Sequence, residues 1–220
     1  MIFLLYLLYL LILYGAIMAG VLHIGFDGHG LRPVEIINDV FGSPPWATLT
    51  LFLAIGIPTV LQFFYPSILA LLRRDTIAFL SGDWWRVITP LFVQDGGLGG
   101  SIFNLVGLLF VGAVAEHLWG GPRLLFIFFI AGIASEFVAL VWQPVGAGNS
   151  VADFALAAGI CILCLARNPF RLERLFAYSV LGAAICLLAL HDIHGAATAL
   201  GGIISLVLIL LDRRISTQPG

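Results

Sequence analysis

Long apolar segments follow one another along almost the whole of this chain. Seven segments are apolar over most of their length: residues 2–22, 47–66, 101–119, 123–142, 150–166, 175–190 and 194–211. A membrane-spanning helix needs roughly 20 mostly apolar residues, and in lipid only helices and closed barrels satisfy every backbone polar group. With 61% hydrophobic and 10% charged residues, the chain is predicted to be an all-α, polytopic membrane helical bundle.

The stretch between the second and third segments is half polar. It contains the runs Ser81-Gly-Asp-Trp-Trp-Arg86 and Gly96-Gly-Leu-Gly-Gly100. Tryptophan is enriched at the headgroup level of membranes. We therefore expect residues 65–100 to run along the membrane interface rather than to span it.

The arginines indicate how the segments are oriented, because all ten basic residues are arginines. Alternation of seven helices places seven of them on one side: Arg32, Arg123, Arg167, Arg171, Arg174, Arg213 and Arg214. The other three fall on the opposite side: Arg73, Arg74 and Arg86. Since cytoplasmic loops carry the excess of positive residues, we expect a cytoplasmic C-terminus, with the N-terminus and the loops 65–100, 143–149 and 191–193 outside.

The first segment lacks the basic start of a secretory signal peptide and is long for one. We therefore predict a membrane helix there, with a cleaved signal peptide as the alternative. The short chain carries no organelle targeting signal that we recognise, which favours a bacterial inner membrane.

Charge and cysteine usage exclude other classes of protein. A net charge of −2 and scattered acidic residues argue against nucleic-acid binding. Cys161, Cys164 and Cys186 all lie inside apolar segments, where we interpret them as small hydrophobic residues rather than as metal ligands or disulfide partners. No cofactor or metal site is predicted.

Ser150 and His194 each begin an apolar segment, and both segments start from the outer side. A serine nucleophile needs a base within hydrogen-bond reach, and a neutral imidazole suits that task near pH 7. Glycines before Ser150 would let a substrate approach closely. Two structural alternatives exist: Ser150 and Asp153 fit a helix capping box, and His194 could be an interfacial aromatic.

Small residues indicate that these two segments pack closely. Ala197, Gly201 and Ser205 repeat every four residues below His194, a pattern typical of tight helix packing in lipid. Phe154, one turn below Ser150, would then pack on the imidazole ring, or else fill the core.

Other polar residues lie near the same depth. Asn104 could donate to a developing oxyanion, or form an ordinary interhelical hydrogen bond. Glu136 could be a structural carboxylate or line an aqueous cavity. Asp153 could orient His194, and His191 could be a rival base.

Taken in order, these residues resemble the rhomboid intramembrane serine proteases. The resemblance rests on Trp85-Arg86, on Phe103-Asn104 with Gly112 and Glu116, on Gly148-Asn-Ser150, and on His194 with Gly201. It covers about residues 47–211, six of the seven segments. It implies a rhomboid-like six-helix domain over residues 47–214, preceded by an extra N-terminal transmembrane helix and loop (1–46) and followed by a short tail (215–220).

The family cleaves transmembrane segments with a Ser–His dyad that has no aspartate. The resemblance therefore implies that Ser150 is the nucleophile and His194 the general base. Asn104 and the backbone N–H of Ser150 would donate to the oxyanion. Supporting roles would fall to Phe154, Trp85, Arg86, Glu116, Gly148, Ala197 and Gly201.

Two positions depart from the family pattern. Gly100 stands where the family usually has a histidine that donates to the oxyanion, and Val151 stands where glycine is common after the serine. Loss of one donor costs on the order of 10²-fold in rate, unless Gln94, Asn149 or a water replaces it.

The sequence thus predicts an intramembrane serine endopeptidase that needs no cofactor, with transmembrane proteins as substrates and the lipid bilayer as its surroundings. The first alternative is a weak or inactive rhomboid-like protein that binds transmembrane helices. A small transporter using Glu136, Asp153 and His194 is a third hypothesis, for which we find no internal repeat.

Overall fold

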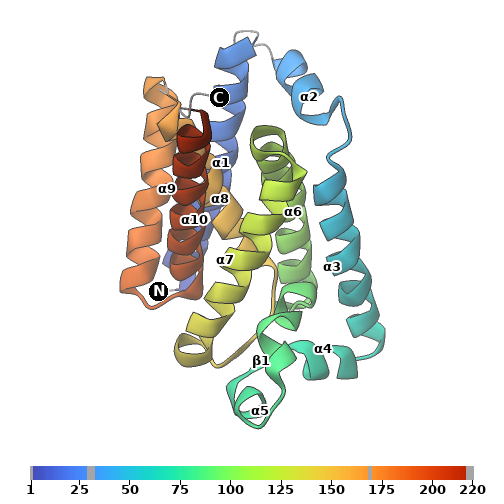
Figure 1. Cartoon of the computed structure of the whole chain (residues 1–220). Coiled ribbons are helices and arrows are strands. Elements are labelled where there is room, and N and C mark those ends of the chain that lie inside the picture. The colour runs from blue at the N-terminus through green and yellow to red at the C-terminus, as the bar shows by residue number, and fades with distance from the viewer. Residues whose placement is uncertain (1, 29–32, 168–169, 217–220) are drawn as a thin grey trace.

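The computed structural model describes residues 2–28, 33–167 and 170–216. Seven long helices form the bundle (Figure 1): α1 (Ile2–Gly28), α3 (Trp46–Phe64), α6 (Gly97–Trp119), α7 (Gly121–Trp142), α8 (Ser150–Ala166), α9 (Arg171–Ala189) and α10 (Ile193–Ser216). They match the seven predicted segments. The loose tail predicted from residue 215 is wrong at Ile215 and Ser216, which belong to α10. Residues 217–220 lie outside the described part, as does Arg32.

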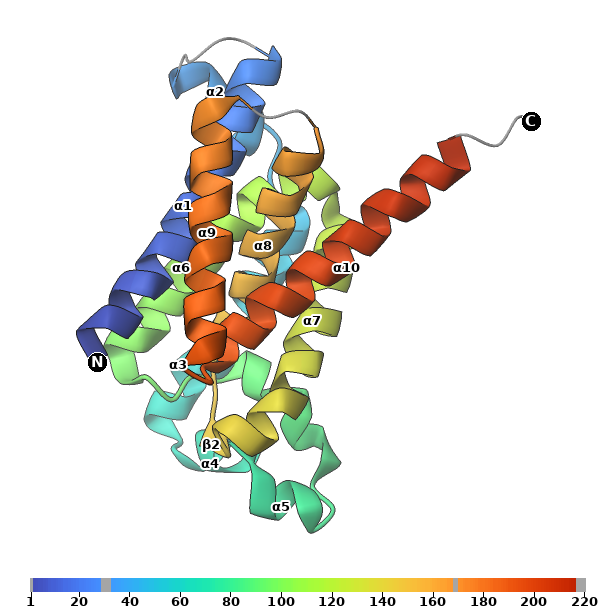
Figure 2. The same ribbon diagram turned by 90° about the vertical axis from the view of Figure 1, so that its left-hand side faces the viewer.

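Six of these helices are long and apolar enough to cross a membrane, whereas α8 has only 17 residues. The short helix is buried along nearly its whole length. It is surrounded by α1, α6, α7, α9 and α10, as Figures 1 and 2 show. Because its neighbours face the lipid in its place, α8 can be shorter than a helix that lines the bilayer.

Backbone contact between α8 and α10 explains the small residues on both helices. A Cβ atom added at Gly201 would lie 2.4 Å from the backbone of Ala155, and one added at Gly159 would lie 2.8 Å from Ser205 Oγ. Ala197 is completely buried. The predicted close packing of these two segments is therefore present.

The stretch between α3 and α6 folds into short elements at one end of the bundle. They are α4 (Ser67–Leu72), β1 (Arg74–Asp75), α5 (Thr76–Leu80) and two 3-10 helices, Trp84–Val87 and Thr89–Phe92. Strand β1 pairs antiparallel with β2 (Val145–Gly146), so this stretch is tied to the loop before α8. None of these elements is long enough to span the membrane, as predicted for this stretch, but the stretch ends before residue 100, because α6 already begins at Gly97.

Arg86 stabilises the stretch between α3 and α6. Its side chain bonds Asp83 at 2.9 Å and donates to the backbone carbonyls of Ala70 and Arg73. Trp85 is half-buried, whereas its neighbour Trp84 is 66% exposed. The Trp-Arg pair thus supports the loop rather than the reacting groups.

At the other end of the bundle, Glu116 of α6 caps the first turn of α3. Its carboxylate accepts hydrogen bonds from the backbone N–H groups of Ala47 (3.0 Å) and Thr48 (2.8 Å) and from the Thr48 hydroxyl. Gly112 lies against the same threonine, because a Cβ there would meet it at 2.6 Å. These contacts satisfy helix N-terminal donors that would otherwise lack partners. The short helix α2 (Pro33–Phe41), which the sequence did not reveal, lies near this end.

The first helix is an integral part of the bundle. Helix α1 packs along α9 and also contacts α8 and α6 (Figure 2). It begins at the end of the bundle that carries α4, α5 and β1 (Figure 1). The extra N-terminal helix therefore reaches the same end as Ser150 and His194.

Candidate active site

Ser150 and His194 meet at the starts of two neighbouring helices. Ser150 is the first residue of α8, and His194 is the second residue of α10. The Ser150 Oγ atom lies 3.0 Å from His194 Nε2, within hydrogen-bond distance. The close packing of α8 and α10 described above places both groups at one level.

The capping box expected as an alternative is absent. The residue that precedes α8 is Asn149, and its side chain makes no capping bond to the helix. The Asp153 carboxylate instead accepts from the Asn149 side chain at 2.7 Å. The serine hydroxyl is therefore directed to the imidazole rather than to the backbone of its own helix.

Two aromatic rings contact the imidazole. The centroid of the Phe154 ring lies 4.7 Å from that of His194, as the sequence led us to expect. A second ring, Tyr9 of α1, lies 4.5 Å from His194 and 5.5 Å from Phe154. Tyr9 was not predicted, because nothing in the apolar pattern of the first segment indicates which helix it faces.

The partner of the second imidazole nitrogen is Asp192. Its Oδ1 atom lies 2.7 Å from His194 Nδ1 and also accepts from the His194 backbone N–H at 2.9 Å. The other oxygen, Oδ2, accepts from the Tyr9 hydroxyl at 2.6 Å. Asp153, the alternative partner considered for His194, bonds Asn149 instead, and the aspartate beside the imidazole is one that the resemblance to a Ser–His dyad does not imply.

Asp192 keeps its charge in this position. Burial raises the pKa of its carboxyl, but the hydrogen bonds and charge of His194 and the Tyr9 hydroxyl outweigh burial, so that the pKa is lowered. The sequence did contain a signal for this residue, because an aspartate directly before an apolar run is a typical helix N-cap.

The rival base His191 lies elsewhere. It is exposed, has a φ of 54°, and packs edge-on against the ring of Trp142 at 5.2 Å. His194 is thus the imidazole within reach of Ser150.

Asn104 faces the same site from α6. Its amide donates to Gln94 Oε1 at 2.7 Å, and Gln94 Nε2 donates to Asn149 Oδ1 at 2.6 Å. Gln94 and Asn149 are buried, at 1% and 0% exposure. Because their amides bond one another, they hold Asn104 in place rather than act as a substitute donor at Gly100.

Gly148 leaves the space between these groups open. A Cβ at this position would lie 3.1 Å from Asn104 Nδ2 and 3.4 Å from Ser150 Oγ. The backbone N–H of Ser150 belongs to the first turn of α8, where such groups have no partner within their helix. A side chain at position 148 would therefore fill the space between the Asn104 amide and the Ser150 hydroxyl.

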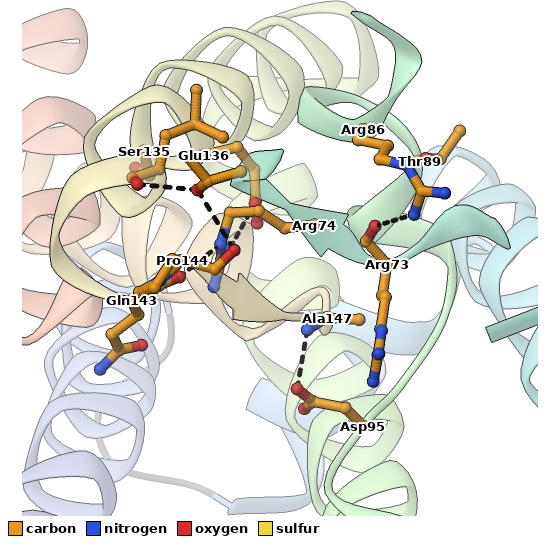
Figure 3. Close-up of polar contacts among 12 residues, drawn as sticks. Arg73, Arg74, Arg86, Thr89, Asp95, Ser135, Glu136, Gln143, Pro144 and Ala147 are labelled. Carbon is orange, nitrogen blue, oxygen red and sulfur yellow. Dashed lines mark hydrogen bonds and ion pairs between the residues drawn. The ribbon is translucent and has the colours of Figure 1, made fainter. Parts of the chain in front are cut away.

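A polar network supports the loop that carries Gly148 (Figure 3). Arg74 of β1 forms a buried ion pair with Glu136 of α7 and donates to the backbone carbonyl of Gln143 at 2.8 Å. Asp95 accepts from the Ala147 backbone N–H at 3.0 Å. Glu136 is therefore a hydrogen-bonded structural carboxylate, and it also lines the cavity described next.

A cavity of about 570 Å³ opens at the serine. Its walls come from α1, the start of α6, the loop 143–148, α8 and α10, and they include Tyr9, Asn104, Ser150 and His194. Gly100 also lines it, and a Cβ added there would meet no atom within 4 Å. The position at which the family histidine is missing is therefore open space.

Comparisons with known proteins identify the family of this chain. Residues 81–215 match the rhomboid domain family. The rhomboid protease GluP of Bacillus subtilis is 29% identical over 101 residues, which are 46% of this chain and 20% of that protein. The putative rhomboid protease YdcA of the same organism is 28% identical over 131 residues, 56% of this chain and 65% of that protein.

A third relative, the rhomboid protease AarA of Providencia stuartii, is 32% identical over 71 residues, 32% of this chain and 25% of that protein. The chain thus spans less than two thirds of the length of each of these relatives. The family match nevertheless covers more than half of the chain, including both Ser150 and His194. The protein is an integral, multi-pass membrane protein and belongs to the rhomboid family.

Proposed function

We propose that this protein is an intramembrane serine endopeptidase that cleaves transmembrane segments of other membrane proteins. The observation that carries the proposal is the 3.0 Å separation of Ser150 Oγ and His194 Nε2 beside an open cavity. A hydroxyl paired with an imidazole in this way is the arrangement of an activated serine nucleophile. The names of the relatives as rhomboid proteases support the same reaction class.

In the proposed reaction, His194 Nε2 takes the proton from Ser150 as the serine oxygen attacks a peptide carbonyl. Asn104 and the backbone N–H of Ser150 donate to the resulting oxyanion. The imidazolium then protonates the leaving amine, and a water molecule hydrolyses the acyl-enzyme with His194 again as the base.

The substrate segment would unwind near its outer end before it is cut, because a peptide bond in a regular helix is shielded. Helix-breaking residues would make this unwinding less costly. The excess of arginines on one side favours a C-terminus in the cytoplasm and a catalytic end that faces outward. We place the protein in a bacterial inner membrane as part of the same proposal.

A fluorophosphonate probe tests this function on the purified chain in detergent. We expect the wild-type protein to be labelled, and labelling to fall at least 10³-fold in Ser150→Ala and in His194→Ala. Ser135→Ala is a matched control, because Ser135 is a buried serine whose hydroxyl donates to the Ala131 carbonyl of its own helix. Labelling that persists in Ser150→Ala would exclude the proposed nucleophile.

The second candidate is a rhomboid-like protein that binds transmembrane helices without cutting them. The empty space at Gly100, where the family's second oxyanion donor is missing, favours it. A folded wild-type protein that binds a transmembrane helix but takes up no fluorophosphonate would support this candidate.

A further inference from the structure

We propose that Asp192 and Tyr9 are positioning residues for His194, so that the first helix completes the active site. The inference rests on the proposed protease function. It adds a third and a fourth member to the Ser–His pair, and it assigns a role to a helix that lies outside the family match at residues 81–215.

The four side chains form one continuous chain of contacts. Tyr9 donates to Asp192 Oδ2 at 2.6 Å, Asp192 Oδ1 lies 2.7 Å from His194 Nδ1, and Nε2 of that imidazole lies 3.0 Å from Ser150 Oγ. Asp192 is 5% exposed and Tyr9 is partly buried. Each carboxylate oxygen therefore has its own partner, as a buried carboxylate requires.

The chain of contacts fixes the imidazole tautomer. An ionised carboxylate beside Nδ1 accepts a hydrogen bond from the N–H of that nitrogen, so the proton stays on Nδ1 and the lone pair of Nε2 is directed at the serine hydroxyl. The same carboxylate stabilises the imidazolium that forms during the reaction. Without it, either nitrogen can carry the proton, and the tautomer with a proton on Nε2 cannot act as the base.

Asp192 also has a structural role that a test must separate from this one. Its Oδ1 atom caps the start of α10 by accepting from the His194 backbone N–H. Asparagine is about as good a helix N-cap as aspartate. Asp192→Asn therefore retains the cap and the shape of the side chain while removing the negative charge.

Tyr9 acts through the aspartate. Its hydroxyl holds Oδ2, while its ring covers the imidazole and contacts Phe154. Tyr9→Phe keeps the ring contacts and removes only the hydrogen bond. Tyr14→Phe is the matched control, because Tyr14 lies on the same helix and is 62% exposed.

The experiment measures the second-order rate of fluorophosphonate labelling of the full chain in detergent, together with the unfolding temperature. We expect Asp192→Asn to label about 10²–10⁴-fold more slowly, as in serine proteases that lose this anion. Tyr9→Phe should label about tenfold more slowly, since a hydrogen bond to a charged group is lost. Tyr14→Phe should match the wild type in labelling rate and unfolding temperature, and Tyr9→Phe and Asp192→Asn should stay folded, with Asp192→Asn losing only the small stabilisation that the charge of Asp192 contributes.

A double variant shows whether Tyr9 acts through Asp192. Residues that act as one unit have non-additive effects, so Tyr9→Phe should have little further effect in the Asp192→Asn background. If the losses of labelling rate in the two single variants simply add in the double variant, Tyr9 does not act through Asp192 and the proposed chain of contacts is overturned. ¹⁵N spectra of His194 give a readout without turnover: the wild type should hold its proton on Nδ1, and Asp192→Asn should show a mixture of tautomers.

The outcomes separate this inference from the proposed function. A wild-type protein that takes up no label, or a labelled Ser150→Ala variant, counts against the protease itself. A labelled wild type together with an Asp192→Asn variant of unchanged rate and tautomer would overturn the inference and leave the protease intact. An unchanged labelling rate in Tyr9→Phe would show that the Tyr9 hydroxyl, and with it α1, does not help to position His194.

Discussion

The two nitrogens of His194 face parts of the molecule that differ in how they are built. On the Nε2 side stands Ser150, which is held by close backbone packing between α8 and α10. On the Nδ1 side stand Asp192, from the loop before α10, and Tyr9, from a helix outside the family match. The first side depends on small residues that allow close approach, and the second depends on two polar contacts.

This difference explains why the two sides should respond differently to change. Two helices in backbone contact cannot move apart slightly to admit a side chain, because interiors are close-packed. A hydrogen bond can be removed by deleting a single side-chain atom, as in Tyr9→Phe, while the surrounding rings stay in place. Substitutions at the close-packed small residues between α8 and α10 should therefore affect folding and activity together, and those of Asp192 and Tyr9 should affect the chemistry far more than the fold.

The largest effect should come from widening the contact between α8 and α10. Gly201→Val places atoms where a Cβ alone lies 2.4 Å from the backbone of Ala155, so we expect destabilisation by about 3 kcal/mol or more and loss of fluorophosphonate labelling. Thermal unfolding in detergent measures the first effect. The control is Gly56→Ala, since a Cβ at Gly56 meets nothing within 4 Å; a Gly201→Val protein with wild-type stability would refute the packing argument.

A smaller effect is expected from removal of the oxyanion donor on the same side. Asn104→Ala should lower the labelling rate by about 10²–10³-fold without loss of the fold, because the site between Gly148 and Ser150 loses its amide. Asn104→Asp, which keeps the size but removes the donor, should be similarly slow. Labelling at the wild-type rate in both variants would mean that Asn104 only supports Gln94.

A gain of activity should follow from filling the open space at Gly100. The cavity has room for a side chain there, so Gly100→His should add a donor and raise the labelling rate by up to about tenfold, or roughly 1.4 kcal/mol of transition-state stabilisation. Gly100→Phe is the control for bulk without a donor. A histidine variant that is no faster than the phenylalanine variant would show that the missing donor does not limit the rate.

The smallest effect concerns the pH dependence of stability on the Nδ1 side. The pKa of Asp192 is lowered in the folded protein. At pH values above the ordinary aspartate pKa of about 4, the ionised carboxylate therefore stabilises the fold. That contribution is lost as the pH falls through the lowered pKa. The difference in unfolding temperature between the wild type and Asp192→Asn should therefore shrink below about pH 4, and a difference that grows on acidification would contradict this sign.

The sequence predicted the Nε2 side because its signals are local. Apolar length located the helices, the repeat from Ala197 to Ser205 indicated a close-packed face, and the positions of Ser150 and His194 at segment starts set their depth. Phe154 followed from the spacing of one helical turn. Each of these signals is read within a single segment.

The Nδ1 side could not be predicted in the same way. Tyr9 and Asp192 are 183 residues apart, and the uniformly apolar first segment does not reveal which face packs on α8 and α9. The pairing of β1 with β2, which brings Arg74 to the loop before α8, is equally non-local. Only the helix-cap position of Asp192 gives a local signal, and a cap position does not show that the carboxylate also faces the imidazole.

The most direct test of the account is the position of the covalent adduct. After the full chain reacts with the fluorophosphonate probe, peptide mapping by mass spectrometry should find the added mass on Ser150, with Ser101, Ser135 and Ser205 unmodified. An adduct on another residue, or none on a folded protein whose Ser150 and His194 are intact, would contradict the claim that these two groups form a nucleophile and its base.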